Sequence, residues 1–235
     1  MRSLIVMMMF AASLTDAAWN GYTEDRELEL DAGGVSAFEI EAGAGTLVVT
    51  GDDSLDTIRV TATIHVPDED DALEIIEKSL RLSLDRHNDK ARLDGWFESQ
   101  GWNWFNDSPW VDLDVRVPHG ITLDVNDGSG SIRILRVHSD VVVDDGSGSI
   151  KIDGATSVFV DDGSGSIDIA NVSGDVEIDD GAGSITVQHV GGSVRVDDGS
   201  GSIRVNDIEH DLIIVDDGSG GLNASNVRGD IENDS

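Results

Sequence analysis

Asp144-Asp145-Gly146-Ser147-Gly148-Ser149-Ile150 is the stretch that decides the fold of this chain of 235 residues. The same heptapeptide recurs at residues 161–167 and 197–203, and it reads DDGAGSI at residues 179–185. Altered copies stand at both ends of the array, NDGSGSI at residues 126–132 and DDGSGGL at residues 216–222. The residues before the first glycine lie 18, 17, 18, 18 and 19 positions apart: Asp127, Asp145, Asp162, Asp180, Asp198 and Asp217. A short, nearly fixed period predicts a solenoid in which each repeat forms one coil.

Each repeat contains two short strands joined by a glycine-rich corner. Apolar residues alternate with variable ones in Val176-Glu177-Ile178 and in Ile185-Thr186-Val187, which is typical of half-buried strands. The Gly-Ser-Gly segment between them can turn tightly. A second corner carries one apolar residue per repeat: Val137, Ala155, Val172, Val190, Ile208 and Val227. We therefore expect an all-β, single-stranded parallel β-solenoid with about 18 residues per coil and with Val and Ile stacked inside.

The preceding region reads as a degenerate form of the same solenoid. Residues 38–49, FEIEAGAGTLVV, follow the repeat pattern position for position. A short helix is expected over residues 72–80, with Leu73, Ile76 and Leu80 on one face. An atypical element of this kind suits a capping region, because the open end of a stack exposes strand edges. The sequence thus predicts an N-terminal capping region at residues 22–118, containing the helix and a Trp-rich loop, and a regular array at residues 119–235.

Residues 1–18 resemble an export signal. Arg2 precedes an apolar run over residues 4–14, and the small residues Ala17 and Ala18 follow; the run is too short to span a bilayer. An uncleaved membrane anchor is the alternative. We expect an exported protein that is periplasmic, at the cell surface or secreted. The sequence has no Cys, which excludes disulfides and cysteine-based metal sites.

The charge of the chain limits its partners. It has 47 acidic and 15 basic residues, for a formal net charge of −32. Nucleic acids and anionic membrane surfaces are bound mainly through Lys and Arg, so neither is expected as a partner. A strongly negative chain attracts cations, and divalent cations stay among the expected partners.

The stacked aspartates suggest calcium, a cation that takes several oxygen ligands. The residues in question are Asp145, Asp162, Asp180, Asp198 and Asp217. Neither the EF-hand spacing nor the calcium β-roll nonapeptide fits, because Ile150 and its equivalents stand where the β-roll requires Asp. The alternative is that each Asp accepts backbone N–H groups of its own corner while its neighbour faces solvent. We expect no firm metal site and no cofactor, with Ca²⁺ as the open alternative.

A cluster of aromatic residues interrupts the acidic sequence. Trp96, Trp102, Trp104 and Trp110 fall within 15 residues. Tryptophans interleaved with Gly, Asn, Asp and Ser can form a platform on which sugar rings stack. The alternative is a loop folded over the solenoid, whose indoles seal the core.

No catalytic constellation is apparent. A serine hydrolase needs one Ser, one His and one acid in fixed geometry, whereas the serines recur in every repeat and the six His fall at unrelated phases of it. Polysaccharide-cleaving β-helices have longer coils with protruding loops. We therefore expect no enzymatic activity.

Three features together suggest a family: the alternation over residues 174–187, the degenerate AGAGTLVV unit, and the Val-Pro-His-Gly turn before the array. In these the chain resembles the bacterial domain of unknown function labelled "putative adhesin". The resemblance covers about residues 24–232 and implies an envelope-associated β-strand-repeat protein without catalytic residues. The resulting hypothesis is an exported, non-enzymatic interaction scaffold with a protein or glycan partner at the cell envelope. A calcium-dependent binding module and a glycan-binding or glycan-cleaving β-helix are the alternatives.

Overall fold

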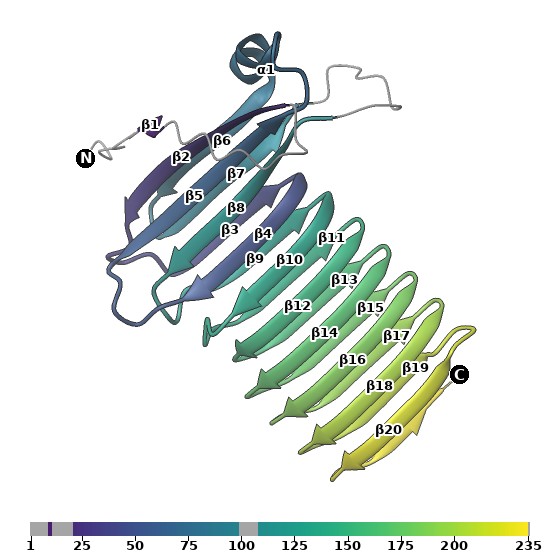
Figure 1. Cartoon of the computed structure of the whole chain (residues 1–235). Coiled ribbons are helices and arrows are strands. Elements are labelled where there is room, and N and C mark those ends of the chain that lie inside the picture. Colours follow the sequence, from purple (N-terminus) through teal and green to yellow (C-terminus); the bar gives the residue numbers. More distant parts are fainter. Residues whose placement is uncertain (1–8, 11–20, 99–107, 235) are drawn as a thin grey trace.

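A computed structural model describes residues 9–10, 21–98 and 108–234 of the chain. Two sheets face each other and form an elongated stack of coils, with one helix at the N-terminal end (Figure 1). We call the eleven-stranded sheet "sheet A" and the ten-stranded one "sheet B". The predicted all-β parallel solenoid with about 18 residues per coil is confirmed.

The spatial order of the strands in each sheet differs from their order in the chain. Sheet A consists, from one edge to the other, of β1 (Met9–Phe10), β2 (Tyr22–Asp31), β5 (Thr57–Val66), β8 (Trp110–Val117), β4 (Ala44–Gly51), β10 (Ser129–Leu135), β12 (Gly148–Ala155), β14 (Gly165–Val172), β16 (Gly183–Val190), β18 (Gly201–Ile208) and β20 (Gly221–Val227). Sheet B consists of β21 (Ile231–Asn233), β19 (Leu212–Asp216), β17 (Val194–Asp198), β15 (Val176–Asp180), β13 (Val158–Asp162), β11 (Val141–Asp145), β9 (Thr122–Asp127), β3 (Ala37–Ala42), β7 (Lys90–Phe97) and β6 (Leu80–His87).

Identical residues stack in register through the regular coils. Each coil places its first strand in sheet B and, after the Gly-Ser-Gly corner, its second strand in sheet A. Ile150 pairs with Ile167, which pairs with Ile185, and all three are buried. Burying each such side chain contributes roughly 1.5–3 kcal/mol, and most of that burial is against neighbouring coils rather than within one coil.

The two corners solve different conformational problems. At the Gly-Ser-Gly corner, Gly165 has φ +150°, and a Cβ there would lie 1.6 Å from the carbonyl oxygen of Gly148. In each coil, the second corner places the residue just before its apolar residue in the left-handed region: Arg136, Gly154, Asn171, His189, Asp207 and Asn226. His138, just after Val137, is left-handed as well. The first corner therefore requires Gly, whereas the second accepts Asn, His and Asp at a modest cost.

The N-terminal coils are not stacked in chain order. The coil formed by β3 and β4 lies between the coil of β7 and β8 and the coil of β9 and β10. Phe38 pairs with Leu123, and Leu47 pairs with Ile132, so the predicted match of residues 38–49 to the repeat is confirmed. In the coil of β7 and β8, the Trp-rich segment takes the place in the chain that the Gly-Ser-Gly corner has in the other coils.

Antiparallel strands close the N-terminal end of the otherwise parallel stack. β2 and β8 both run antiparallel to β5, and β6 runs antiparallel to β7. The connections into β5 (residues 52–56) and into β7 (residues 88–89) are too short for a parallel crossover. β1 pairs antiparallel with β2; the rest of the predicted export signal, residues 1–8 and 11–18, lies outside the described residues.

The helix α1 (Ala72–Ser79) forms where it was predicted, beside the antiparallel end of the stack (Figure 1). Asp71 is its N-cap residue, but its side chain makes no capping hydrogen bond. Ile76 is buried, while Leu73 is 69% exposed, so the predicted apolar face is wrong at Leu73. No helix in the described part of the chain is both long enough and apolar enough to cross a membrane.

Candidate functional site

A row of buried carboxyls runs along the inside of the Gly-Ser-Gly corner. We call it the inner Asp row: Asp127, Asp145, Asp162, Asp180 and Asp198, with exposed fractions between 0% and 5%. The row follows from the strand period of two, because in V-x-V-D-D the second Asp has the same inward phase as the two valines. The repeat pattern predicted that these residues are equivalent, but their burial was missed, although the same alternation already indicated it.

Each inner carboxyl is only half satisfied. Oδ1 of Asp145 accepts the backbone N–H of Ser147 at 3.2 Å, and Asp162, Asp180 and Asp198 accept the equivalent N–H groups at 3.1, 3.1 and 3.0 Å. Oδ2 of all five is enclosed and has no hydrogen-bond partner among the described residues. A buried, unpaired carboxylate oxygen is costly, so this geometry favours the protonated acid.

The pKa values of the inner Asp row are raised accordingly. Burial, with the neighbouring Asp145 carboxyl, raises the pKa of Asp127 to about 7. Burial also raises the pKa of Asp145 and of Asp180 to about 6, with smaller contributions from adjacent acids. The pKa values of Asp162 and Asp198 are raised for the same main reason. Asp127, Asp145 and Asp180 therefore take up protons between about pH 6 and 7.

The preceding Asp of each repeat points outward. This outer Asp row consists of Asp144, Asp161, Asp179 and Asp197, which pair in register across sheet B. Partial burial, together with Asp161 and Asp197, raises the pKa of Asp179. In each repeat, then, one Asp accepts a backbone N–H of its own corner and the preceding Asp faces solvent. This is the arrangement that the alternative to calcium binding predicted.

The candidate calcium residues do not all share one environment. Asp145, Asp162, Asp180 and Asp198 lie in the inner row, whereas Asp217 is half-buried and outside it. The register shifts between Val196 and Asp197, so that Asp197 pairs with Asp216. Among residues 9–10, 21–98 and 108–234, no group of three or more acidic or histidine side chains is arranged to hold a metal ion. Calcium binding stays a prediction that a measurement must decide.

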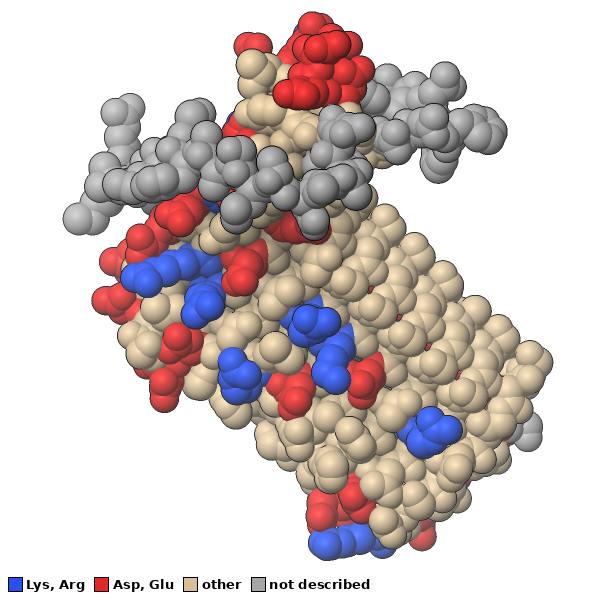
Figure 2. Space-filling model, viewed as in Figure 1, with Lys and Arg blue, Asp and Glu red and all other residues tan. Residues whose placement is uncertain are grey.

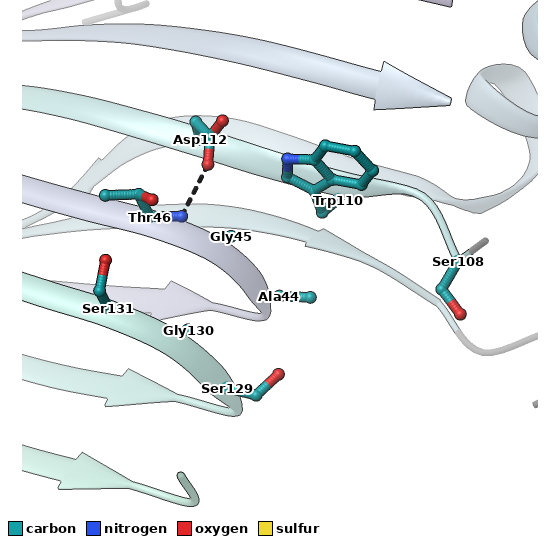
Figure 3. A pocket seen from close by; sticks show the side chains of 9 residues that line it. All are labelled: Ala44, Gly45, Thr46, Ser108, Trp110, Asp112, Ser129, Gly130 and Ser131. Atoms are coloured by element: carbon teal, nitrogen blue, oxygen red, sulfur yellow. Dashed lines mark hydrogen bonds between the residues drawn. The ribbon is translucent and has the colours of Figure 1, made fainter. Parts of the chain in front are cut away.

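A hollow of about 610 Å³ lies on sheet A beside Trp110. Its lining comes from three neighbouring strands: Trp110 and Asp112 from β8, Ala44 and Thr46 from β4, and Ser129 and Ser131 from β10 (Figure 3). The strand register brings these residues together from three places that are distant in the sequence.

Trp110 and Asp112 are held by residues of adjacent strands. The Trp110 indole stacks on His65, with ring centroids 4.6 Å apart and planes 12° from parallel. Oδ2 of Asp112 lies 3.1 Å from Nε2 of His65, and its Oδ1 accepts the backbone N–H of Thr46 at 2.7 Å. Sequence reasoning missed His65 and Asp112, because only the cross-strand pairing of β5, β8 and β4 reveals their proximity.

The other tryptophans named from the sequence lie elsewhere. Trp96 is half-buried on β7 in sheet B, opposite Arg81, and does not line the hollow. Trp102 and Trp104 lie outside the described residues. Of the four, the structure therefore places Trp110 alone at a described hollow.

Hydroxyl and charged side chains are distributed unevenly over the visible face of sheet A. Serines pair in register beside the Gly-Ser-Gly corner, from Ser131 through Ser149, Ser166 and Ser184 to Ser202. Figure 2 shows this edge of the face without acidic or basic groups on its surface, while acidic groups gather around the N-terminal strands and helix. His138 and His189 lie at the second corner, at the opposite end of the strands from these serines.

No family model matches the sequence, and no curated protein matches it significantly. Among solved structures, the chain is similar to a "putative adhesin" from Bacteroides fragilis NCTC 9343, with 14% identity, 90% of this chain and 97% of that chain covered, and a TM-score of 0.45. A "putative adhesin" from Parabacteroides distasonis ATCC 8503 shows 11% identity, with 91% of this chain and 98% of that chain covered and a TM-score of 0.43. A "putative cell adhesion protein" from Clostridium sporogenes ATCC 15579 shows 9% identity, with 90% of this chain and 98% of that chain covered and a TM-score of 0.38. These descriptions agree with the family resemblance seen in the sequence, but at such TM-scores they carry no argument about what this chain binds.

Proposed function

We propose that the chain is an exported, non-enzymatic scaffold of the cell envelope that holds side chains in fixed positions for a protein or glycan partner. One observation carries the proposal: a constant interior combined with variable outward positions. From β9 to β17 in sheet B, two inward positions of each strand are Leu, Val or Ile, whereas the outward row between these two reads Asp124, Val142, Phe159, Glu177 and Arg195. Because stacking depends on the interior, outward side chains can differ without loss of the coil geometry.

An exposed apolar pair marks one section of this outward row. Val142 and Phe159 are register partners on β11 and β13, with exposed fractions of 38% and 39%. Asp124 and Glu177 flank them on the neighbouring strands. An apolar pair between carboxylates suits a partner that presents an apolar group beside a basic one.

The arrangement of hydroxyls and imidazoles supports a non-enzymatic role. The serine rows repeat through the coils, and His138 and His189 stand at the other corner. General-base activation of a serine needs hydrogen-bond contact between the two side chains. The serine rows are better explained as a solvated polar edge.

The test begins with the full chain carrying its own N-terminal segment. Export is measured by fractionating the producing cells, and partner binding by sedimentation of the purified chain with cell-envelope fractions. Replacing Val142 and Phe159 by Ser removes the apolar pair, and we expect envelope binding to fall several-fold. The matched control replaces two exposed residues of sheet A, Arg133→Ser and Arg204→Ser, and should bind as the native chain does.

Three results would contradict the proposal. The first is recovery of the chain from the cytoplasm alone, and the second is a lack of binding to every envelope fraction. The third is conversion of a bound component into a product, detected by mass spectrometry, which would replace the scaffold by an enzyme.

A further inference from the structure

We propose that the outer face of sheet B, along β11, β13, β15 and β17, docks a basic amphipathic helix of a protein partner. The proposal deepens the scaffold function by naming the class of partner, and it rests on that function for its place at the cell envelope. The four strands follow one another along the stack (Figure 1). They present the exposed pair Val142 and Phe159 and, beside it, the outer Asp row.

The first argument is that the outer Asp row lacks a basic partner in the described part of the chain. Asp144, Asp161 and Asp179 are exposed, and no described residue forms a hydrogen bond or an ion pair with their carboxyls. At the N-terminal end of the same row the chain supplies its own cation, because Nη2 of Arg92 lies 3.5 Å from Oε1 of Glu41. Neighbouring carboxylates of the row repel by roughly 1 kcal/mol even in water, so basic groups from a partner would relieve a repulsion that the chain leaves in place.

The second argument is a contrast with the column on the other side of the apolar pair. There Asp140 accepts the hydroxyl of Ser157 at 2.7 Å, and Asp175 accepts the backbone N–H of Ser193 at 2.7 Å. These two carboxylates hold the second corner of one coil to the next. The fold itself therefore accounts for this column, whereas it makes no use of the carboxyls of the outer Asp row.

The third argument is the position of the apolar pair. Val142 and Phe159 are register partners and are among the exposed large hydrophobic residues of the described chain. Asp144 and Asp161 stand two residues further along the same strands, so their side chains lie on the same face, about 6.8 Å away. A partner that fits this block needs an apolar stripe with a basic stripe directly beside it.

The spacing of the coils selects a helix as the element that carries these stripes. Successive carboxylates of the outer Asp row are about 4.8 Å apart, and successive turns of an α-helix are about 5.4 Å apart. For a helix along the stack with one Lys or Arg per turn, the mismatch grows to only about 2 Å over four carboxylates. In an extended segment, residues of one side recur about every 6.8 Å, so the mismatch reaches about 2 Å at each coil. An amphipathic helix also places an apolar stripe beside a charged one.

The charge of the face favours a basic polypeptide over a glycan. A neutral glycan would leave the outer Asp row without counter-charges, and an acidic glycan would add anions to it. The formal charge of −32 on the whole chain further increases the rate at which a basic partner arrives.

Fluorescence anisotropy with the full chain tests the proposal. The probe is a labelled alanine-based peptide of about 20 residues, long enough to form a helix, with one Lys per turn beside one Leu per turn. The first comparison peptide has the same composition in scrambled order, and the second has Glu in place of Lys. We expect the ordered peptide to bind about tenfold or more tightly than the scrambled one, and the Glu peptide not to bind. Affinity for the ordered peptide should fall as salt is added.

A pair of charge variants identifies the face. Asp161→Asn combined with Asp179→Asn should weaken binding of the ordered peptide by about tenfold. The substitution is compatible with the coil, since Asn126 already occupies an equivalent position in this row, and the unfolding temperature verifies that the variant is folded. Glu69→Gln combined with Asp70→Asn is the matched control, because it removes the same charge from exposed positions before α1, and it should bind as the native chain does.

Two results would overturn the proposal at the level of the peptide: equal binding of the ordered and scrambled peptides, or native affinity in the Asp161 and Asp179 variant. Treatment of the cell-envelope fractions provides a further test. Protease digestion of the fractions should abolish sedimentation of the chain with them, and periodate oxidation of their glycans should not. Envelope binding that survives the protease would overturn the helix and leave the scaffold standing. A lack of all envelope binding, with peptide binding intact, would contradict the scaffold function instead, so the two failures are distinguishable.

Discussion

Asp162 and Asp180 occupy the same position in successive coils, paired across β13 and β15, and both carboxyls are buried. Neighbouring parallel strands lie about 4.8 Å apart. Two unit charges at that separation repel by about 3 kcal/mol at an effective dielectric constant of about 20. Five such carboxyls in one row cannot all be ionised without a large loss of stability, so protonation and folding are coupled.

The first prediction is that the protein becomes more stable as the pH falls from 8 to 5. The folded-state pKa is about 7 for Asp127 and about 6 for Asp145 and Asp180, against about 3.9 for Asp in an unfolded chain. Between about pH 4 and 7 the folded state thus holds more protons than the unfolded one, and the free energy of unfolding falls as the pH rises. Urea unfolding at about pH 5, 6.5 and 8 and constant ionic strength measures the effect, which should amount to a few kcal/mol.

The carboxyls with lowered pKa values act outside this pH range. Glu29, Glu39 and Glu74 have lowered pKa values because of hydrogen bonds from Thr57, Lys90 and Lys78, respectively. Their stabilising contribution is present above the unfolded pKa and is lost only when the pH falls below about 4.5. A stability that is constant or rising between about pH 5 and 8 would contradict protonation of the inner Asp row.

The second prediction separates the inner row from the general negative charge. Asp145→Asn keeps an oxygen for the Ser147 N–H and adds a donor toward Asp127 and Asp162, its register neighbours. We expect a gain of about 1–3 kcal/mol in unfolding free energy at pH 8 and little gain at pH 5. The adjacent, exposed Asp144 supplies the control: Asp144→Asn removes the same charge and should change stability by a few tenths of a kcal/mol. Equal effects of the two substitutions would mean that only net charge matters.

Much of the solenoid could be predicted because its information is local and repeated. Asp145, Asp162, Asp180 and Asp198 recur at nearly constant spacing, and a residue's phase in the repeat determines whether it faces inward. The match of residues 38–49 to the repeat was visible for the same reason, although those residues stack next to β9 and β10 across a gap of some seventy positions.

The order of the N-terminal coils and the hollow depend on pairing between distant segments. Nothing local indicates that β4 lies between β8 and β10, or that His65 of β5 stacks on Trp110 of β8. The alternation alone does not distinguish antiparallel from parallel strands, because both alternate with a period of two. The Trp cluster indicated an unusual segment, but the polar half of the hollow is formed by Asp112 and Ser131, which the alternation presents as ordinary outward residues.

The third prediction concerns the Gly-Ser-Gly corner. Gly165→Ala forces a non-glycine residue to φ +150° and places its Cβ 1.6 Å from the Gly148 carbonyl oxygen. We expect a loss of about 3 kcal/mol or more, because backbone must move in two coils. Gly221→Ala is the control, since a Cβ there meets no atom within 4 Å, and it should stay within about 0.5 kcal/mol of the native chain. Similar losses at both positions would show that the close contact between coils is not what the corner requires.

The fourth prediction decides between calcium binding and simple screening of charge. In Asp145 and Asp162 one carboxyl oxygen is held by a backbone N–H and the other is enclosed, while the outer Asp row faces solvent. Ca²⁺ takes six to eight oxygen ligands, and neither row offers such a cage to one ion. We therefore expect Ca²⁺ and Mg²⁺ at matched ionic strength to raise the thermal midpoint equally, and EDTA to have no specific effect. A midpoint raised by Ca²⁺ alone would mean, by linkage between binding and folding, that the aspartates form true sites. The Asp145→Asn and Asp144→Asn variants would then show which row supplies the ligands, because only the substitution in the binding row should abolish the calcium response.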